Sequence, residues 1–582
     1  MKTIMAMCLA LLLSGAAWGD VRIEADGIPD DLREALEVAR PDDPAPETRF
    51  EARRQARRAA TRLTDFLNSE AFFDARVTPY VEPGPPIVPT VRVETGPQFK
   101  VSGQEITYVG CAPDEAAQAA AKAALTLNTG DVPFPDLVLI AEQQALAALK
   151  DAGYGTAEVR PRDVVGDRAA GTVEIIYSIT AGPKIELGDV IYEDPIRIRP
   201  KYRERIVPFD LGEVYSPDKL ATLDERLAAS RLYSIFGVRL AEAGAPSETG
   251  ETETRNVIVS ATERPRNTIT AGASFSTAEG PGATLEWTRR NLTRRGDELR
   301  LRTVLADLER SLGADWLLPH AFGYGRALTA NVFGGREDTD AFDRTTALLG
   351  LGLDIDRGGD LRLLFGSAVE YTNETDVSGE RDLFIYSVSS EALIDKANSL
   401  LDPTNGWRAR ARIEPGLIAG DTNDNFTSVI AEASVYEGFG GRDRYVLAGR
   451  VRAGSVFGAA SLDLPTSRRF FAGGGGSARG FGFQDIGPRD EDNVPTGGRG
   501  LLELAGEARW RFRKNIGLAA FVDGASVTSD AAPSFDDFRV GAGVGVRYYT
   551  AIGPIRFDIA TPLNPQEGDD PVQVYISIGQ AF

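Results

Sequence analysis

The sequence predicts three small α+β domains followed by an all-β transmembrane barrel of about 16 antiparallel strands. Three observations predict this fold class. A helix–strand pattern repeats up to residue 265, alternating apolar and polar residues take over from residue 266, and no segment after the N-terminus holds the ~18 continuous apolar residues of a membrane-spanning helix. With 582 residues, the chain has room for several domains.

The first 20 residues, MKTIMAMCLALLLSGAAWGD, have the features of a secretory signal. Lys2 precedes an apolar run over residues 4–13, which is too short to span a bilayer, and small residues follow it. Ala17 and Gly19 suit a signal-peptidase site. We therefore expect residues 1–19 to be removed and the mature chain to begin at Asp20.

The composition argues against several classes of function. A formal net charge of −21 supplies no basic footprint for nucleic acid. Cys8 falls in the signal, so Cys111 stands alone in the mature chain and makes neither an intrachain disulfide nor a zinc site by itself. His320 is the one histidine, and a lone histidine is more often a packing residue than a ligand or a base. We predict no catalytic residue, no metal and no cofactor, and therefore no enzyme.

Residues 20–265 carry an internal repeat. ETGPQFKVSGQEI matches ITAGPKIELGDVI, and ATERPRNTI is a weaker third copy; their shared proline is Pro97, Pro183 and Pro265. Before each proline lie two strand patterns and, before those, a helical pattern that ends in an aromatic residue. A repeat of roughly 80 residues predicts one small mixed domain per copy. These domains are placed at 20–98, 99–183 and 184–265.

From residue 266 to residue 582 the pattern is that of short alternating strands. One face of the strand predicted at 540–549 holds valine, alanine and tyrosine, and the opposite face holds glycine and arginine. The strands predicted at 268–276, 407–413 and 507–513 alternate in the same way. A soluble sandwich also alternates, but faces rich in arginine and glycine, opposite apolar faces that end in aromatic residues, are typical of a membrane barrel with a polar lumen.

The final segment, PVQVYISIGQAF, predicts a strand that closes the barrel. Ile576, Ile578 and Phe582 lie on one alternating face, and an aromatic residue ends the chain instead of a polar tail. This strand must pair with the first barrel strand, near 267–276. Because that first strand is rich in small residues, and Gly579 and Gln580 interrupt the last one, we expect a weak seam that opens sideways and templates an incoming strand.

The stretch RRFFAGGGGSARGFGFQDIGP, residues 468–488, is the most unusual in the chain. It has no lysine, which a phosphate-binding P-loop needs. A dinucleotide fingerprint would have to join a strand to a helix, whereas strands surround this segment. A flexible linker is an alternative, although linkers rarely hold several phenylalanines among their glycines.

The same stretch resembles the inward-folded loop of the superfamily of outer-membrane assembly and two-partner-secretion transporters. That loop carries an Arg-Gly-aromatic triplet, here Arg479, Gly480 and Phe481, usually preceded by Val or Ile where this chain has Ala478. The resemblance implies periplasmic POTRA repeats, a barrel of about 16 strands, and an inward loop at 465–490.

The resemblance also implies partners for the loop arginine. In the superfamily it reaches a Phe-x-Asp motif on a late strand and an acidic residue on the strand before, and the matching positions here are Phe521, Asp523 and Glu507. Alternation agrees, because Leu518 and Val522 form an apolar outer face and leave Phe521 and Asp523 facing inward. An arginine in a partly dehydrated lumen needs a carboxylate, which its guanidinium meets bidentately. Such a pair either gates the barrel or braces it.

The motifs LLDPTNGW, FVDGASV and GVGVRYYTAIGPIRFDIATPL are most similar to the TamA family, the outer-membrane subunits of the translocation and assembly module. This resemblance implies insertion of unfolded β-barrel or autotransporter clients into the lipid bilayer of the outer membrane of a diderm bacterium. It also implies a TamB-like partner, anchored in the inner membrane and reaching periplasmic POTRA domains that accept strands. The alternatives are the central barrel-assembly subunit, typically with five repeats, a two-partner-secretion exporter, typically with two repeats and a plug helix, and a passive porin.

Overall fold

The computed structural model of the protein describes residues 21–242, 245–246, 252–277, 279–356, 360–441, 443–550 and 553–582. The signal predicted at 1–19 lies outside these residues and stays a prediction. The chain divides into two compact units. One takes in residues up to 191 with 208–223 and 238–259, and the other takes in 192–207, 224–237 and 260–582.

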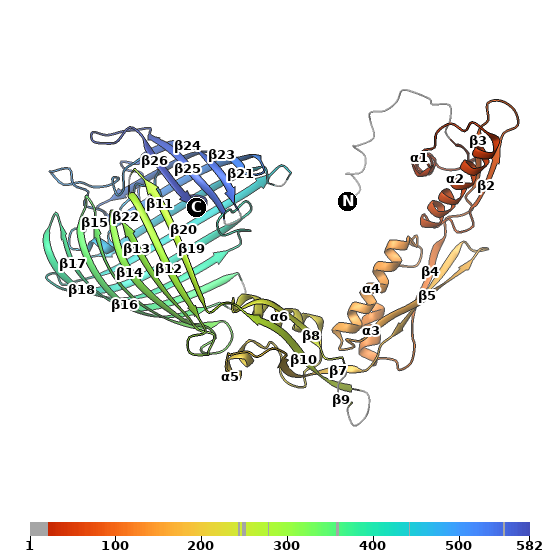
Figure 1. The fold of residues 1–582 in the computed structure, drawn as a ribbon, viewed down its shortest axis with the longest axis horizontal. Coiled ribbons are helices and arrows are strands. Elements are labelled where there is room, and N and C mark those ends of the chain that lie inside the picture. Colours follow the sequence, from red (N-terminus) through yellow and green to blue (C-terminus); the bar gives the residue numbers. More distant parts are fainter. Residues whose placement is uncertain are drawn as a thin grey trace. The chain divides into compact units, whose positions relative to one another are not determined.

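The N-terminal part of the chain forms three small sheets with accompanying helices (Figure 1). Their strand orders are β1-β3-β2, β4-β6-β5 and β7-β10-β8, with the short β9 beside β10. The strands are β1 (Arg22–Glu24), β2 (Arg76–Val81), β3 (Pro89–Glu94), β4 (Lys100–Tyr108), β5 (Glu158–Asp167), β6 (Thr172–Thr180), β7 (Lys184–Tyr192), β8 (Tyr233–Leu240), β9 (Ala245–Pro246) and β10 (Thr252–Glu263). Each sheet lies within one of the three predicted segments, whose boundaries stay a prediction.

Helices accompany the sheets of this part. They are α1 (Asp30–Ala39), α2 (Arg49–Ser69), α3 (Glu115–Ala123), α4 (Pro135–Asp151), α5 (Pro200–Arg203), the 3₁₀ turn η1 (Glu204–Ile206) and α6 (Pro217–Ala229). Of these, α2 and α4 contact strands directly. In α2, Thr48 caps the start, because its hydroxyl accepts a hydrogen bond from the Glu51 N–H at 3.2 Å. Leu63 and Leu67, one turn apart, pack into the same core as Val91 of β3.

The C-terminal part is a closed antiparallel barrel. Within the described residues, 16 strands follow one another around it, and the last pairs back to the first, which confirms the predicted fold class. The strands are β11 (Asn267–Ser276), β12 (Gly280–Arg290), β13 (Glu298–Ala306), β14 (Glu309–Leu318), β15 (Arg326–Asp338), β16 (Asp343–Ile355), β17 (Leu361–Asp376), β18 (Gly379–Asp395), β19 (Gly406–Gly420), β20 (Asp424–Phe439), β21 (Tyr445–Gly458), β22 (Gly500–Arg513), β23 (Ile516–Thr528), β24 (Arg539–Thr550), β25 (Gly553–Pro562) and β26 (Gln573–Ile578).

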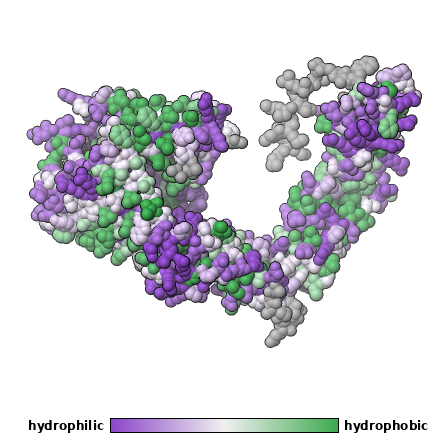
Figure 2. All heavy atoms as spheres, in the orientation of Figure 1, coloured by the Kyte–Doolittle hydropathy of each residue, from purple (hydrophilic) through white to green (hydrophobic). Residues whose placement is uncertain are grey.

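Side chains alternate along these strands between an apolar outer surface and a polar lumen. On β24, Val544 is 62% exposed on the outside while Arg547 is fully buried on the inside. Apolar side chains cover much of the outer surface of the barrel in Figure 2. Among the described residues, no helix is both long and apolar enough to cross a membrane.

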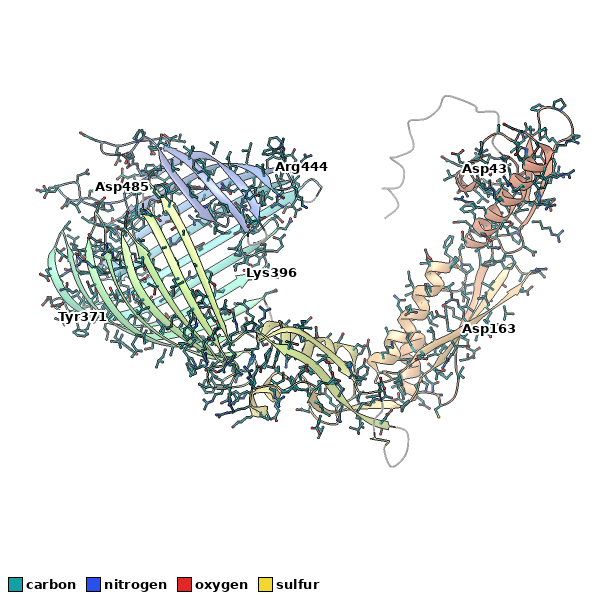
Figure 3. All side chains as sticks on the ribbon, viewed as in Figure 1. Asp43, Asp163, Tyr371, Lys396, Arg444 and Asp485 are labelled. Atoms are coloured by element: carbon teal, nitrogen blue, oxygen red, sulfur yellow. The ribbon has the colours of Figure 1, made fainter. Side chains whose placement is uncertain are left out.

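The two ends of the barrel differ in what they carry. We call the end at which β11 begins the entry end, and the opposite one the far end. Because the strands are antiparallel, the turn between β18 and β19 and the segment after β26 lie at the entry end, and the long β21–β22 connection starts from the far end. Figure 3 shows Lys396 and Arg444 at the entry end and Tyr371 and Asp485 at the far end.

Candidate functional site: the inward loop and the barrel seam

Residues 459–499, which join β21 to β22, fold back into the barrel as an inward loop. The loop is closed on itself by isolated bridges between Phe470 and Gly498 and between Ala472 and Ile486. Its buried apolar residues pack against the inner faces of β22 and β23 in one cluster: Ala472, Ala478, Phe481, Ile486, Leu501, Ala525 and Val527. The loop is therefore a packed element of the lumen and not a flexible linker.

Glycine is required where the loop backbone touches the barrel wall. Gly480 has a φ of +106°, and a Cβ there would lie 3.0 Å from the Thr561 carbonyl oxygen. On the wall itself, a Cβ at Gly541 would lie 2.1 Å from the Arg479 carbonyl oxygen. Gly473 and Gly474 of the four-glycine run also have positive φ, at +108° and +91°, which glycine adopts without strain. Glycine at Gly480 and Gly541 lets the backbone at Arg479 lie against the wall.

Arg479 is 1% exposed and contacts the partners that the sequence analysis predicts for it. Its Nε and Nη2 donate to the two carboxylate oxygens of Asp523, at 2.6 and 3.0 Å, and its main-chain N–H donates to the same carboxylate at 3.2 Å. Nη1 donates to Glu507 Oε2 at 2.8 Å. The guanidinium also lies 3.4 Å from the centre of the Phe521 ring. The structure thus brings Arg479, Phe521, Asp523 and Glu507 into one buried site.

Further charged residues that the sequence reasoning missed complete this site. Asp558 of β25 accepts a hydrogen bond from Arg479 Nη1 at 3.2 Å. Arg547 of β24 pairs with Asp558 and also donates to Glu507 at 3.3 Å, and Arg509 donates to Glu507 at 2.6 Å. The signal for them was their place on the inward faces of strands, since a buried charge needs an opposite one. We call the six residues Arg479, Arg509, Arg547, Glu507, Asp523 and Asp558 the lumen network; their formal charges cancel.

The base of the loop is tied to β17 by a second set of ionic contacts, also missed from sequence. Arg469, 6% exposed, pairs with Asp376 at 2.7 Å, and Arg468 pairs with Glu370 at 2.8 Å. The Thr466 N–H donates to Glu374 Oε2 at 3.0 Å. The loop is consequently fixed at its base and at its tip, on different sides of the lumen.

The loop tip also touches both sides of the seam, at β26 and at the turn after β11. The Gly480 N–H donates to the Tyr575 hydroxyl at 3.2 Å, and that hydroxyl donates to the Phe481 carbonyl oxygen at 3.2 Å. Tyr575 belongs to β26. On the other side, the Gly475 N–H donates to Glu279 in the turn after β11 at 3.3 Å. The loop therefore braces the far end of the seam.

The seam between β11 and β26 is short. β11 pairs with β12 along its whole length, but with β26 only through Phe275 and Ser276, which face Ile576 and Tyr575. Beyond the strand end Thr277 adds three hydrogen bonds to β26. Its N–H donates to the Val574 carbonyl oxygen at 3.0 Å, its hydroxyl donates to Gln573 Oε1 at 2.5 Å, and its hydroxyl oxygen accepts one from the Val574 N–H at 3.0 Å. In the described part of the chain, residues 267–274 have no partner in β26, and residues 267–275 are all exposed.

The closing strand differs from the prediction at its end. Ile576 and Ile578 are exposed on the outer face, as alternation predicts, but β26 ends at Ile578 and the placing of Phe582 in the strand is wrong. Gly579, with a φ of +94°, breaks the strand. The chain then turns toward the lumen, where the Arg450 guanidinium lies 5.4 Å from the centre of the Phe582 ring and Arg509 Nη2 donates to the Phe582 main-chain oxygen at 3.4 Å.

His320 packs in the turn after β14. Its ring stacks on Tyr324 at 5.1 Å between centres, and the Arg226 guanidinium lies 3.8 Å from the Tyr324 ring on the other side. Its Nδ1 accepts a hydrogen bond from the Gly325 N–H at 3.1 Å. Burial, with the nearby charges of Arg226 and Arg205, lowers the pKa of His320 to about 4. The ring is thus neutral at pH 7 and shares none of the contacts of the lumen network.

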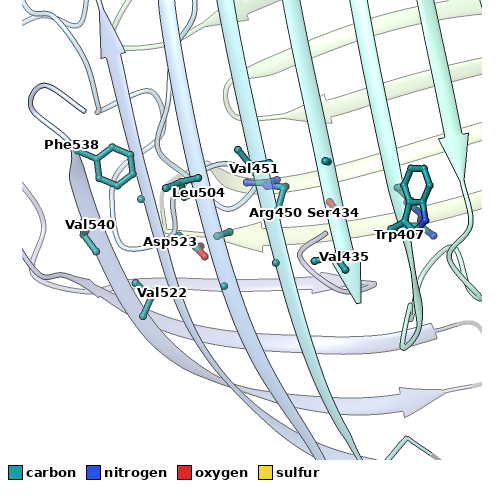
Figure 4. Close-up of a pocket in the computed structure, with 16 residues that line it drawn as sticks. Trp407, Ser434, Val435, Arg450, Val451, Leu504, Val522, Asp523, Phe538 and Val540 are labelled. Atoms are coloured by element: carbon teal, nitrogen blue, oxygen red, sulfur yellow. The ribbon is translucent and has the colours of Figure 1, made fainter. Parts of the chain in front are cut away.

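The outer wall carries an apolar hollow of about 630 Å³ across β19 to β24 (Figure 4). It is lined by Gly449 of β21 and Gly506 of β22, which face each other, and by Trp407, Val435 and Val522 among others. Such a surface suits acyl chains and not a polar substrate. Within the described ranges, no cluster of histidine, cysteine, aspartate and glutamate has the arrangement of a metal site.

Comparisons with known proteins point to one family. The model of the Omp85 superfamily domain matches residues 291–582. The outer membrane protein assembly factor BamA of Nitratidesulfovibrio vulgaris is 25% identical over 560 residues, covering 90% of this chain and 68% of that protein. BamA of Neorickettsia risticii is 22% identical over 469 residues, covering 75% of this chain and 60% of that protein.

A solved structure shows the same fold. BamA from Haemophilus ducreyi, lacking POTRA domains 1–3, superposes with a TM-score of 0.67 at 18% identity, and the match covers 82% of this chain and 100% of that one. The chain spans about two thirds of the length of the curated relatives it matches. These matches show similarity in sequence and fold.

Proposed function

Because the chain belongs to the Omp85 superfamily, we propose that it inserts β-barrel client proteins into the outer membrane through the seam between β11 and β26. The barrel is an outer-membrane barrel with its small POTRA-like domains in the periplasm, so that the entry end faces the periplasm. The proposed mechanism is non-covalent and uses no catalytic residue. The clients are unfolded outer-membrane proteins.

The observation that carries this proposal is the free edge of β11. Over residues 267–274 this strand has a neighbour on one side only, among the residues described. The N–H and C=O groups that point to the unpaired side of β11 lie at the height of the bilayer. Each backbone group left without a hydrogen bond in hydrocarbon costs on the order of several kcal/mol. A client strand that pairs with this edge satisfies them, and so the edge favours strand addition.

The inward loop confines this opening to one part of the seam. The strand pairs at Phe275 and Ser276 lie at the far end, and there the loop contacts Tyr575 and Glu279. Because the lumen network holds the loop against β22, β23 and β25, the far end is closed at rest while residues 267–274 of β11 are free. Clients that arrive from the periplasm therefore meet the open part of the seam first. For an inserted client to leave the barrel sideways, the pairs at Phe275 and Ser276 have to part as well.

A finer assignment within the family is also proposed. The motif resemblance supports a TamA-like subunit with a TamB-like periplasmic partner and autotransporter clients. The names of the curated relatives favour a second candidate, the central assembly factor. Affinity capture of the full chain from envelope membranes separates the two. A long, inner-membrane-anchored partner supports the first assignment, and capture of other outer-membrane assembly subunits in its place overturns it.

Insertion itself is tested by reconstitution. The full chain is placed in liposomes, a urea-denatured barrel client is diluted in, and the folded fraction is read from its altered gel mobility. We expect the initial rate to exceed that in liposomes with an unrelated porin by about tenfold, a barrier difference of ~1.4 kcal/mol. Equal rates, together with ion conductance like that of the porin, would support a passive pore and refute insertion.

A further inference from the structure

The motif LLDPTNGW forms a turn that reaches the chain's last residues. Residues 396–405 join β18 to β19 at the entry end, and residues 579–582, here called the tail, follow β26 at the same end. The Leu401 carbonyl oxygen accepts a hydrogen bond from the Gln580 N–H at 3.0 Å. Asp402 Oδ1 accepts one from Gln580 Nε2 at 2.9 Å. The Leu401 side chain fills the space beside Gly579, 3.5 Å from where a Cβ would stand.

These contacts join opposite sides of the barrel. Strands β20–β25 separate β19 from β26 in one direction, and β11–β17 separate β18 from β26 in the other. The turn therefore has to extend across the entry end to meet the tail. Arg511 of β22 donates to Asp402 Oδ2 at 2.6 Å, and Arg509 donates to the Pro403 carbonyl oxygen at 3.0 Å. Both arginines hold the turn in this extended position.

The turn is also held by bonds within it and by bonds to the connection between β20 and β21. Asn398 Oδ1 accepts hydrogen bonds from the main-chain N–H groups of Thr404 and Asn405, at 2.9 and 3.2 Å. The Thr404 hydroxyl and the Asn405 amide both donate to Asp443 Oδ2, at 2.8 and 3.0 Å. A turn fixed by these internal and external bonds presents Leu401 and Asp402 to the tail without further ordering.

Gln580 also links the tail to the lumen network. Arg547 Nε donates to Gln580 Oε1 at 3.0 Å, and Arg547 also pairs with Asp558 and Glu507. Gly579 takes up the positive φ that turns the tail away from the strand direction. Gln580 is thus bonded through both atoms of its side-chain amide, one to the turn and one to the network.

We propose that Leu401 and Asp402 form a latch that holds the tail inside the lumen. The latch thereby keeps the edge of β11 over residues 267–274 free. In the observed register Phe275 faces Ile576 and Ser276 faces Tyr575. An extended strand would continue this register and set Gly579 opposite Gly272, and Ala581 opposite Thr270. A released tail would pair with the edge that clients are proposed to use. The effect of the latch on client insertion rests on the proposed function, whereas the position of the tail can be tested without any client.

The test is a disulfide between Thr270→Cys and Ala581→Cys in the full chain, in a Cys111→Ser background and in its native membrane. With the latch intact we expect little crosslink. Asp402→Ala removes the bond to Gln580, and Gly579→Ala disfavours the positive φ of the tail. Each should raise the crosslinked fraction at least about fivefold, an equilibrium shift of ~1 kcal/mol.

Two controls make the result specific. Asp360→Ala removes a carboxylate from the neighbouring turn, where it pairs with Lys396 at 2.7 Å and not with the tail, and it should leave the crosslink at the parent level. A second cysteine pair, Phe275→Cys with Ile576→Cys, should crosslink in every variant that folds, because these residues face each other in the observed register.

Four outcomes decide the matter. A high crosslink in the parent, or a parent-level crosslink in both Asp402→Ala and Gly579→Ala while the control pair still forms, overturns the latch. A raised crosslink with reduced client insertion supports the latch and its role. A raised crosslink with undiminished insertion leaves the latch standing and contradicts entry of clients along β11, so the two failures are distinguishable.

Discussion

Replacing Arg479 with alanine should leave Asp523 as a buried carboxylate without a cation. The hydrogen bonds that the described residues give to the Asp523 carboxylate all come from Arg479, two from the guanidinium and one from the main chain. The other carboxylates of the lumen network keep a partner: Glu507 keeps Arg509, and Asp558 keeps Arg547. The perturbation therefore falls mainly on Asp523.

The size of the effect follows from burial and geometry. Arg479 and Asp523 are 1% and 2% exposed and meet bidentately, and removing one partner of such a pair typically costs about 3–5 kcal/mol. Removing both charges leaves no stranded carboxylate at Asp523. The double variant should consequently lose less than the sum of the single losses, with a coupling of about 2–3 kcal/mol.

This cycle is measured by urea unfolding in detergent micelles, with the folded barrel read from its gel mobility. Protease cleavage within residues 459–499 reports separately on the loop, which we expect to loosen in Arg479→Ala and in Asp523→Ala. Arg479→Lys is the matched variant that keeps the charge but loses the bidentate contact, and it should lie between the parent and alanine. Single losses that add within about 0.5 kcal/mol would refute the pairing as an energetic unit.

Two further substitutions follow from the site, and one follows from His320. Gly480→Ala should loosen the loop, because its φ of +106° and the Thr561 oxygen at 3.0 Å leave no place for a Cβ, and faster proteolysis of the loop checks this. Phe521→Leu should reduce the urea stability of the barrel by about 0.5–2 kcal/mol, because it removes the ring under Arg479. In the unfolded chain His320 binds a proton below about pH 6.5, whereas in the folded chain it stays neutral down to about pH 4. The free energy of unfolding should therefore decrease as the pH is lowered through this window, by up to ~3 kcal/mol. His320→Phe should remove that part of the pH dependence, as measured by unfolding at pH 7, 5 and 4.

Each of these has a clear contrary result. A Gly480→Ala loop as resistant to protease as the parent would mean that the wall yields around the new methyl group. Unchanged stability of Phe521→Leu would mean that the ring contributes packing alone. An identical fall in stability with pH in the parent and in His320→Phe would assign the effect to carboxylates elsewhere.

The inward positions of Phe521, Asp523 and Glu507 were predictable because side chains alternate strictly along a strand. Once Val522 is assigned to the outer face, its neighbours Phe521 and Asp523 must face the lumen. The same alternation predicts the apolar outer surface of the barrel, on which Val522 is 51% exposed. A local period of this kind is present in the sequence itself and needs no knowledge of distant contacts.

The contacts that alternation cannot give are those between distant strands. It sets Arg547 and Asp558 inward but does not say that they meet each other and Glu507, because that depends on the register of β24 and β25. The error at Phe582 has the same origin. Gly579 and Gln580 interrupt the alternation, which is visible in the sequence, but the turn that holds Gln580 comes from the opposite side of the barrel and has no local signature.

Locking the seam tests the central claim most directly. Cysteines in place of Phe275 and Ile576, which face each other in β11 and β26 and lie on the outer surface, join the two strands by a disulfide in a Cys111→Ser background. Client insertion into liposomes is then measured before and after reduction, with each single-cysteine variant as control. We predict that the oxidised protein fails to insert clients and that reduction restores the parent rate. Full insertion with the seam locked would contradict the account.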